Sequence, residues 1–459
     1  MHQPVTAQQA LQSARDTRCL EIGHGLLSRV PRIFREQFGD RSAVLVADRN
    51  TFAVAGREVA GALKSAGISA PTPIIFEDPN LYAEYSFIDK LESALQLHNA
   101  IPVACGSGTI NDLVKLAAHH LGRPYLCVAT AASMDGYAAF GSSITREGSK
   151  QTFLCPAPQA IVADLGVISA APVGMSAWGY ADLMAKVPAG ADWILADALG
   201  VEPINRNAWN IVQGRLPELL SDPAGVEAGT PAAAGKLIEG LMLSGFAMQA
   251  SESSRPASGA EHQFSHLWDM QHHTHRGRAP SHGFKVGIGT LAVTALYEEL
   301  FRQPIENLDV DRCCAAWPDL DECIAQARAA LQSADLRRVA VQEIAAKHCD
   351  REGLRSQLLK LRDAWPELRE RLQRQLLPLL DLQHRLLAVG APILPEEIGI
   401  SRERLRRSYG QAYFIRRRFT VLDLAVHTGL LDECLAKIFG PLGPWPIVGE
   451  TTGGHGSLA

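Results

Sequence analysis

The chain lacks the features that mark membrane, secreted and nucleic-acid-binding proteins. None of its apolar runs approaches the roughly 20 residues that a membrane-spanning helix needs, and residues 1–23 lack the apolar core of a secretory signal. Lysine and arginine total 44 against 49 acidic residues, so the net charge of −5 offers no basic surface for nucleic acid or an anionic membrane. These absences predict a cytoplasmic protein with no membrane span and no nucleic-acid partner.

Paired-cysteine motifs and internal repeats are also missing. The nine cysteines are scattered without a CxxC pair, and Cys105, Cys127 and Cys155 lie in apolar segments. An odd, unpatterned set of this kind indicates reduced, buried thiols rather than a disulfide framework.

What is present indicates a large globular protein with an α/β first part. Hydrophobic residues make up 47% of the 459 residues, which is typical of a folded chain too long for one core, so we expect two or three domains. Apolar runs that predict strands alternate with helical patterns: strands at 43–47, 73–76, 100–105 and 125–129, and helices at 54–66, 85–97 and 110–121. This alternation predicts a Rossmann-like parallel-sheet domain over residues 1–168.

From about residue 169 the pattern becomes helical. Stretches rich in Ala, Leu, Glu and Arg predict helices at 234–252, 293–302, 320–349 and 354–387. We therefore expect an all-helical domain over 169–440, with the boundary near 165–175. The Gly- and Pro-rich residues 441–459 predict a loose tail.

Six histidines gather between Ser253 and Thr290. His262 and His266 are four residues apart, which places both rings on one face of a helix, and His282 opens a run rich in small residues. Imidazole is a common ligand of zinc, nickel and iron, and a catalytic site takes about three protein ligands. We hypothesise that two of these histidines and a carboxylate from elsewhere hold a metal; the alternative is a His-rich exposed helix and loop.

Asp182 is the carboxylate that we select as the third ligand. It lies in an otherwise apolar helical segment, where an acid is costly unless it is paired or bound to a metal. The alternative is an ordinary helix salt bridge with Lys186, one turn further on.

Two strand ends carry small residues suited to a nucleotide. The segment Gly106 to Asp112 joins a predicted strand to a helix, so its backbone N–H groups would approach a phosphate closely, although a capped tight turn has the same appearance. Thr130 to Ser133 follow the next strand, at an edge where ligands gather. Asp48 ends an earlier strand as a ribose contact or a cap, and Asp135 is an active-site acid or a cap.

Five blocks together resemble a known family: GSGTIND, TAASMDGY, GYADLMAK, SGAEHQFSH and HGFKVGIGT. Their order and spacing, over roughly residues 20 to 300, resemble the sn-glycerol-1-phosphate dehydrogenases. These belong to the superfamily of metal-dependent polyol dehydrogenases and 3-dehydroquinate synthases. The resemblance implies a Rossmann-like NAD(P)-binding domain, a helical metal-binding domain, and interconversion of dihydroxyacetone phosphate and sn-glycerol 1-phosphate.

The resemblance also implies residue roles. The implied metal ligands are Asp182, His262 and His282, and the implied catalytic and substrate contacts are Asp182, His266 and Asp135. The implied cofactor contacts are Asp48, Gly106, Gly108, Thr109, Ile110, Asn111, Asp112, Thr130, Ala131, Ala132 and Ser133. The sequence departs from the family at Ala139, where a serine is frequent, and at Phe284, where a glutamate is frequent.

Several choices stay open at this level. The metal is zinc, nickel or iron, the cofactor is NAD or NADP, and candidates for the substrate phosphate are Lys186, Arg255 and Lys285. We expect a homo-oligomer acting on a small phosphorylated three-carbon substrate. The alternatives are a glycerol or polyol dehydrogenase, a dehydroquinate synthase-like lyase, and a non-enzymatic binding protein.

Overall fold

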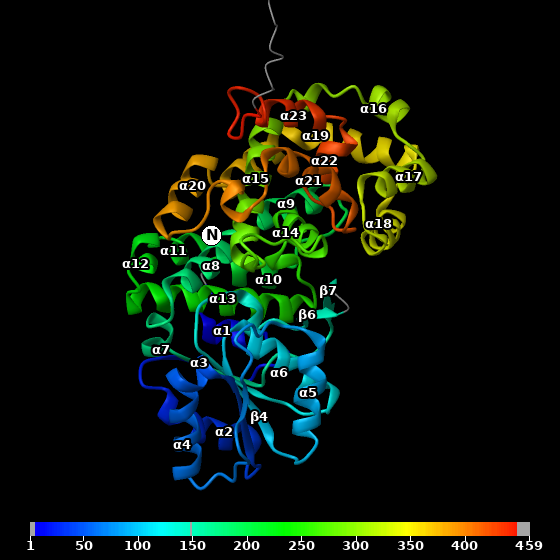
Figure 1. Ribbon diagram of the computed structural model, residues 1–459. Helices are drawn as coiled ribbons and strands as arrows, with labels where there is room; N and C mark the ends of the chain where they lie inside the picture. Colours follow the sequence, from blue (N-terminus) through cyan, green and yellow to red (C-terminus); the bar gives the residue numbers. More distant parts are fainter. Residues whose placement is uncertain (1–4, 147–148, 448–459) are drawn as a thin grey trace, which may run out of the picture.

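The computed structural model describes residues 5–146 and 149–447. Figure 1 shows a sheet-containing part in blue and cyan, and a larger helical part in green to red that packs against one end of it. The described chain therefore has the two parts that the sequence predicts, while a boundary at residue 168 stays a prediction.

The sheet consists of six parallel strands in the order β1-β8-β5-β4-β2-β3. Their bounds are β1 Cys19–Gly23, β2 Ala43–Asp48, β3 Ile74–Phe76, β4 Ile101–Gly106, β5 Leu126–Ala129 and β8 Ala160–Asp164. Strands β2 to β5 confirm the four predicted strands, and β1 and β8 are additional. Gly106 at the end of β4 lies opposite Ala129 at the end of β5, so the two segments chosen as nucleotide loops leave the same edge of the sheet.

Alternating side chains bury both faces of this sheet. In β2, Val44 and Val46 belong to the core on one face, while Leu45 and Ala47 belong to the core on the other. The first face is covered by α5 Tyr85–Leu95 and α6 Gly108–His120, and the second by α2 Val30–Phe38 and α4 Arg57–Ser65. Near-continuous burial of strand residues is what a parallel sheet covered on both faces requires.

A separate antiparallel hairpin of β6 Ser142–Arg146 and β7 Ser149–Phe153 precedes β8, and the second part that follows is helical. Its main helices are α7 Leu165–Ser169, α8 Val173–Met184, α9 Lys186–Ala198, α10 Arg206–Gln213, α13 Pro231–Ser251, α14 Ala260–Met270, α15 His282–Phe301, α16 Val310–Ala316, α17 Leu320–Ala330, α18 Ala334–Lys347, α19 Arg351–Gln375, α20 Leu379–Ala388, α21 Arg402–Phe414, α22 Val421–His427 and α23 Leu431–Ile438.

Three of the four predicted long helices have different bounds. The helix predicted at 293–302 begins at His282. Glycines in its first turns have low helix propensity, but they allow close packing against other helices. The stretch 320–349 divides into α17 and α18, where Ser333 caps the second helix. The stretch 354–387 divides before α20, whose first residue follows Pro378; proline lacks the N–H that would continue the preceding helix.

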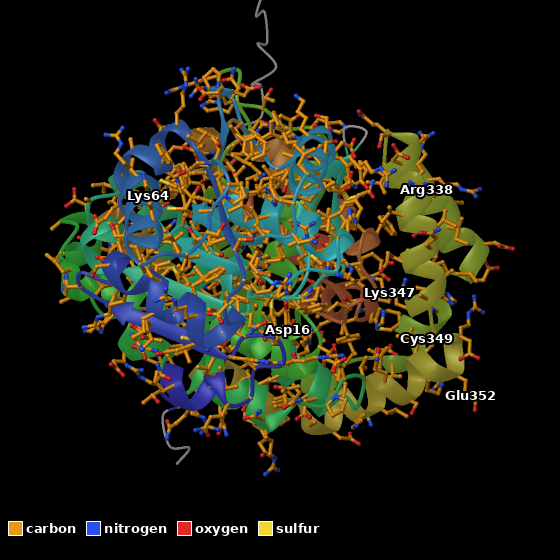
Figure 2. The ribbon with its side chains drawn as sticks, turned by 90° about the horizontal axis from the view of Figure 1, so that it is seen from below. Asp16, Lys64, Arg338, Lys347, Cys349 and Glu352 are labelled. Atoms are coloured by element: carbon orange, nitrogen blue, oxygen red, sulfur yellow. The ribbon has the colours of Figure 1, made fainter. Side chains whose placement is uncertain are left out.

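A buried lysine attaches the α17–α18 pair to the rest of the helical part. The Lys347 ammonium donates to the carbonyl of Tyr413 at 2.6 Å and to Oδ1 of Asp423 at 2.9 Å. Figure 2 shows Lys347 on the inner side of this pair, facing the neighbouring helices.

The predicted tail begins as packed structure. The Trp445 side chain is fully buried, and its backbone N–H donates to the carbonyl of Ile438, so the prediction of a loose segment from 441 is wrong for this residue. Residues 448–459 lie outside the described residues. Within the described ranges, no helix combines the length and apolar character that crossing a bilayer requires.

Candidate active site

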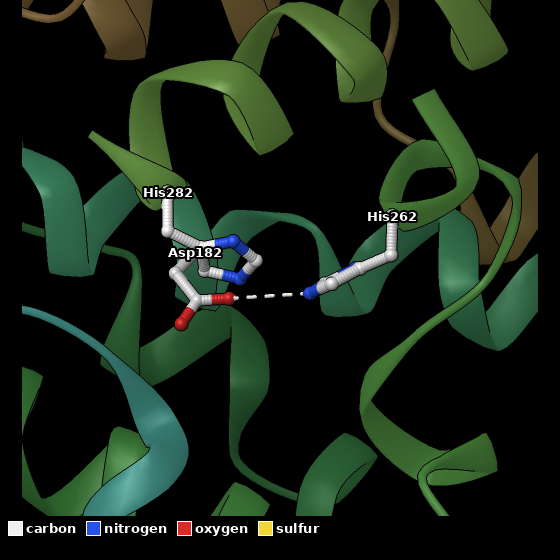
Figure 3. A group of neighbouring side chains, drawn as sticks. All are labelled: Asp182, His262 and His282. Carbon is white, nitrogen blue, oxygen red and sulfur yellow. Dashed lines mark ion pairs between the residues drawn. The ribbon is translucent and has the colours of Figure 1, made fainter. Parts of the chain in front are cut away.

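Three helices bring an acid and two imidazoles together. Asp182 lies in α8, His262 in α14, and His282 at the start of α15, and one ligand atom from each lies within 4.8 Å of the others. Figure 3 shows the three side chains pointing toward one another. Asp182 is fully buried, His262 is almost so, and His282 is half-buried, which gives the cluster one partly open side.

Two glycines allow these helices to approach so closely. A Cβ on Gly283, next to His282, would lie 2.0 Å from the carbonyl oxygen of Trp178 in α8. A Cβ on Gly289 would lie 2.4 Å from the carbonyl oxygen of Glu261 in α14. Both contacts involve backbone, which cannot move aside as a flexible side chain can, so only glycine fits. The small-residue run after His282 therefore packs α15 against both partner helices.

Asp182 is also held by an ion-pair network. Oδ1 of Asp182 lies 2.8 Å from the Lys186 ammonium, and Oδ2 of Asp182 accepts the backbone N–H of Asp135 at 3.0 Å. The same ammonium lies 2.8 Å from Oδ2 of Asp135. Burial alone would raise the pKa of Asp182, but the charges of Lys186 and of both histidines hold it well below its usual range. Ser244 adds a hydrogen bond to Oδ2 of Asp135 at 2.8 Å. Asp182 is therefore ionised, as a metal ligand must be.

Each imidazole of the cluster has a neighbour on its Nδ1 atom. His262 Nδ1 lies 2.7 Å from Oε1 of Glu261, and its Nε2 lies 3.6 Å from Oδ1 of Asp182. His282 Nδ1 lies 3.4 Å from Oγ of Ser265. Burial lowers the pKa of His262, but the hydrogen bonds to Asp182 and Glu261 raise it by more. The net shift of this pKa is therefore upward.

His266 lies one turn after His262, beside the same cluster. Its ring centroid is 6.2 Å from that of His262 and 6.4 Å from that of His282. It is half-buried and is not one of the three residues whose ligand atoms converge. Its contact with a substrate stays a prediction.

The glycine turn adjoins the helix that carries Asp182. A Cβ on Gly108, the first residue of α6, would lie 2.4 Å from Cε of Met134. A Cβ on Gly179 in α8 would lie 2.0 Å from the carbonyl oxygen of Ala132. The segment 130–136 thus lies between the turn and α8, so the two predicted nucleotide loops and the three-residue cluster belong to one region.

The chain is similar in sequence and fold to known proteins. A family model described as iron-containing alcohol dehydrogenase matches residues 21–172. A glycerol-1-phosphate dehydrogenase of Halalkalibacterium halodurans is 34% identical over 290 residues, which cover 63% of this chain and 72% of the relative. The enzyme of the same name from Methanosarcina mazei is 33% identical over 277 residues, covering 60% and 75%. That of Bacillus licheniformis is 26% identical over 438 residues, covering 95% and 93%.

The chain belongs to the glycerol-1-phosphate dehydrogenase family. A solved structure of a probable glycerol dehydrogenase from Sinorhizobium meliloti aligns with a TM-score of 0.59 over 92% of this chain and 97% of its own, at 16% identity. At that identity the likeness shows a shared fold. The match to the Bacillus licheniformis relative extends over residues after 300.

The residues that the resemblance assigned to cofactor binding have protein partners of their own. Asp48 caps the helical turn that follows β2 by accepting two backbone N–H groups, as its alternative interpretation predicted. The Asn111 amide donates to the carbonyl of Gly136 and accepts from the hydroxyl of Tyr125. The other residues so assigned are Gly106 at the end of β4, Gly108, Thr109, Ile110 and Asp112 in α6, and Thr130, Ala131, Ala132 and Ser133 in the segment after β5. Their contact with a cofactor stays a prediction.

The three candidates for the substrate phosphate are all paired. Lys186 is buried between Asp182 and Asp135, and Lys285 forms an ion pair with Asp269. Arg255 is buried and donates to two backbone carbonyls. Asp182 therefore forms the predicted salt bridge with Lys186, and the same carboxylate also faces the two histidines of the cluster.

Both departures from the family are accommodated by packing. Phe284 makes an edge-to-face contact with Trp178 at 6.3 Å between ring centroids. Ala139 packs against Met248 and Ala257 in a small apolar cluster.

Sequence reasoning missed two residues that touch the cluster. Glu261 precedes His262 directly, and Ser265 reaches His282 from the same helix. The available signal for Glu261 was its position directly before His262, where a carboxylate can accept a hydrogen bond from the imidazole.

Proposed function

We propose that this protein is a metal-dependent oxidoreductase that uses NAD(P)H to interconvert dihydroxyacetone phosphate and sn-glycerol 1-phosphate. The observation that carries the proposal is the convergence of Asp182, His262 and His282 beside two strand-end loops. The relatives' names, which include NAD(P)+ and glycerol 1-phosphate, supply the substrate and cofactor of the proposal.

The residues present fit a divalent cation. One carboxylate and two imidazoles form a ligand set that zinc, nickel and iron all accept, and three protein ligands leave a position for substrate. The carboxylates of Asp135 and Asp182 and the ammonium of Lys186 together carry one net negative charge, which attracts a dication.

Each element has a task in the proposed reaction. When bound, the cation polarises the ketone oxygen of dihydroxyacetone phosphate and the nicotinamide supplies the hydride. The N–H groups of the first turn of α6 and the loop 130–133 hold the dinucleotide at the sheet edge. His266 binds the substrate and relays the proton to the oxygen that becomes the hydroxyl, since an imidazole titrates near the operating pH.

The decisive experiment is an assay of the purified protein with dihydroxyacetone phosphate. NADH or NADPH oxidation is followed by the absorbance of the reduced nicotinamide, after chelation and after separate addition of Zn²⁺, Ni²⁺ or Fe²⁺. We expect turnover only in the presence of a cation. A protein that binds cation and nucleotide but oxidises no NAD(P)H with this ketone would contradict the proposal.

Matched substrates separate this function from its rivals. A glycerol dehydrogenase turns over unphosphorylated dihydroxyacetone and glycerol, whereas the proposed enzyme requires the phosphate. A dehydroquinate synthase-like lyase regenerates its cofactor and therefore shows no net NAD(P)H consumption with dihydroxyacetone phosphate.

A further inference from the structure

A buried carboxylate next to the cluster has no part in the reaction proposed above. The Glu261 side chain is fully buried, and its Oε1 lies 2.7 Å from Nδ1 of His262. The same oxygen accepts the backbone N–H of Gly259 at 2.6 Å. A buried carboxylate is retained at a cost, and here its hydrogen bonds run to a candidate ligand and to the start of α14.

This contact determines which nitrogen of His262 can bind a cation. A carboxylate accepts hydrogen bonds, so Nδ1 of the neutral imidazole carries the proton and donates it to Glu261. The lone pair of the ring is then on Nε2, the atom that faces Oδ1 of Asp182 at 3.6 Å. Metal-binding imidazoles generally have such a partner, which fixes the tautomer and the orientation of the ring.

A second carboxylate holds the helix segment that carries Glu261. Asp192 in α9 accepts the backbone N–H of Ala260 at 2.7 Å, through Oδ2. Its Oδ1 accepts the Tyr297 hydroxyl at 2.6 Å and the N–H of Val421 at 2.9 Å. The first turn of α14 is thereby attached to α9, α15 and α22 at one point.

The two carboxylates meet at a glycine. A Cβ on Gly259 would lie 2.5 Å from Oδ2 of Asp192 and 2.8 Å from Oε2 of Glu261, so this position has room only for hydrogen. Gly259 caps α14 without a side chain, and the two acids accept the N–H groups that such a cap leaves open. The start of α14 is thus built to hold Glu261 against His262.

We propose that Glu261 is a positioning residue that fixes His262 with Nε2 toward the cation, and that Asp192 holds Glu261 in place. Glu261 acts through His262 and does not touch the substrate, the cofactor or the reacting atoms. This inference rests on the proposed function, because it requires that the cluster binds a cation.

The test measures cation affinity directly. The metal-free full-length protein competes with a chromophoric chelator for Zn²⁺, and Co²⁺ absorption reports the ligand geometry. We expect Glu261→Ala to weaken Zn²⁺ binding about 10- to 100-fold, the usual cost of removing such a partner. Glu261→Gln keeps an acceptor oxygen without the charge, so we expect a loss of less than about 10-fold and a Co²⁺ spectrum close to that of the unchanged protein.

The control is Glu202→Gln, which removes a carboxylate that lies 3.4 Å from Arg255 and not beside a histidine of the cluster. It should bind Zn²⁺ as the unchanged protein does. A role confined to folding would lower the melting temperature of the Glu261 variants without changing the affinity of the folded protein. If the alanine variant does not fold, Glu261→Met replaces it, because methionine fills the space but removes both acceptor oxygens, and a Zn²⁺ affinity equal to that of the unchanged protein in this variant would overturn the inference.

Failure of the proposed function gives a different result. If the unchanged protein itself binds neither Zn²⁺ nor Co²⁺ at the cluster, the metal assignment fails and the Glu261 inference fails with it. If the unchanged protein binds cation and Glu261→Ala binds it equally well, the inference about Glu261 alone is wrong.

Discussion

At the scale of single residues, one carboxylate of the site has two kinds of partner. Asp182 pairs with Lys186 and also faces two imidazoles. The ammonium keeps the carboxylate ionised in a fully buried position, where an acid without partners would become protonated. The i,i+4 spacing that suggested an ordinary helix salt bridge therefore also maintains a candidate ligand in its binding form.

His262 and His266 form a matched pair for testing roles on one helix. We expect His262→Ala to lose the bound cation and nearly all turnover, because its ring is one of three converging ligands. His266→Ala should keep the cation and lower turnover about 10²- to 10⁴-fold, the range for loss of a general acid or base. Metal content by elemental analysis, measured beside turnover, checks both. Loss of cation from the His266 variant would mean that the two histidines exchange roles.

Replacing Lys186 should reveal the negative charge that it balances. Lys186→Met leaves Asp135 and Asp182 buried without their cation, and breaking a buried pair costs about 3–5 kcal/mol. We expect a lower melting temperature for the metal-free variant, and a larger rise on adding Zn²⁺ than in the unchanged protein, because the dication replaces the missing charge. Thermal denaturation with and without Zn²⁺ measures both, and an equal rise in the two proteins would contradict this account.

At the scale of elements, close helix contacts determine where the ligands meet. Gly283→Ala should separate α15 from α8, because its Cβ would lie 2.0 Å from the Trp178 carbonyl oxygen. We expect a loss of stability of about 1–3 kcal/mol from overpacking and weaker Zn²⁺ binding, both seen in denaturation and chelator competition. Gly410→Ala is the control, since a Cβ there meets nothing within 4 Å. An unchanged Zn²⁺ affinity in the Gly283 variant would show that the cluster tolerates this displacement.

The elements divide into those that local patterns predict and those that pairing creates. Strands β2 to β5 are apolar runs bounded by turns, and the sequence predicts them. Strand β1 has Glu21 at its centre and only one buried residue, and β8 has alanine at two of five positions, so neither has a strong strand pattern of its own. They become strands because β1 pairs with β8, and β8 with β5.

The sequence pattern also did not predict the start of α15, because its first residues have low helix propensity. Four positions among its first eight are His282, Gly283, Gly287 and Gly289, and glycine disfavours an isolated helix by about 1 kcal/mol relative to alanine. The pattern therefore predicts a loop before 293. Tertiary packing outweighs that propensity, because glycine alone permits the backbone contacts with α8 and α14.

At the scale of the whole molecule, a buried histidine in the C-terminal helices should make stability depend on pH. Burial lowers the pKa of His427 to about 4, with Lys347 and His348 lowering it and Asp423 opposing them. Its Nδ1 lies 2.7 Å from Oε1 of Gln357. The unfolded chain, with an ordinary pKa of about 6.5, binds the proton first. The stabilising contribution is therefore complete above about pH 6.5 and is lost as the pH falls toward 4.

The measurement is urea denaturation at pH 7 and pH 5. We expect the free energy of unfolding to be lower at pH 5 than at pH 7. This decrease should be about 1–2 kcal/mol smaller in His427→Gln than in the unchanged protein, because each pH unit between the two pKa values contributes about 1.4 kcal/mol. His24→Gln, at an exposed position, should leave the fall as it is in the unchanged protein. An equal fall in the His427 variant would contradict this assignment.

The candidate site was predictable in its residue types and less so in its supports. The acid in an apolar helical segment singled out Asp182, the histidine-rich stretch predicted two imidazole ligands, and the family resemblance implied that these are His262 and His282; the structure places the three side chains together. Asp192 and Ser244 stayed hidden because their partners are distant in sequence or are backbone groups, and a pattern along the chain does not contain such contacts. Glu261 is next to His262 in the sequence, but its contact with that ring depends on how the two side chains are oriented in the folded protein.

The spread of the three converging side chains over positions 182, 262 and 282 also sets the order of events during synthesis. No nascent chain that ends before His282 carries the complete set, and the amide of Val421 that steadies Asp192 emerges from the ribosome later still. A cation held by all three side chains would therefore bind only after His282 has been synthesised.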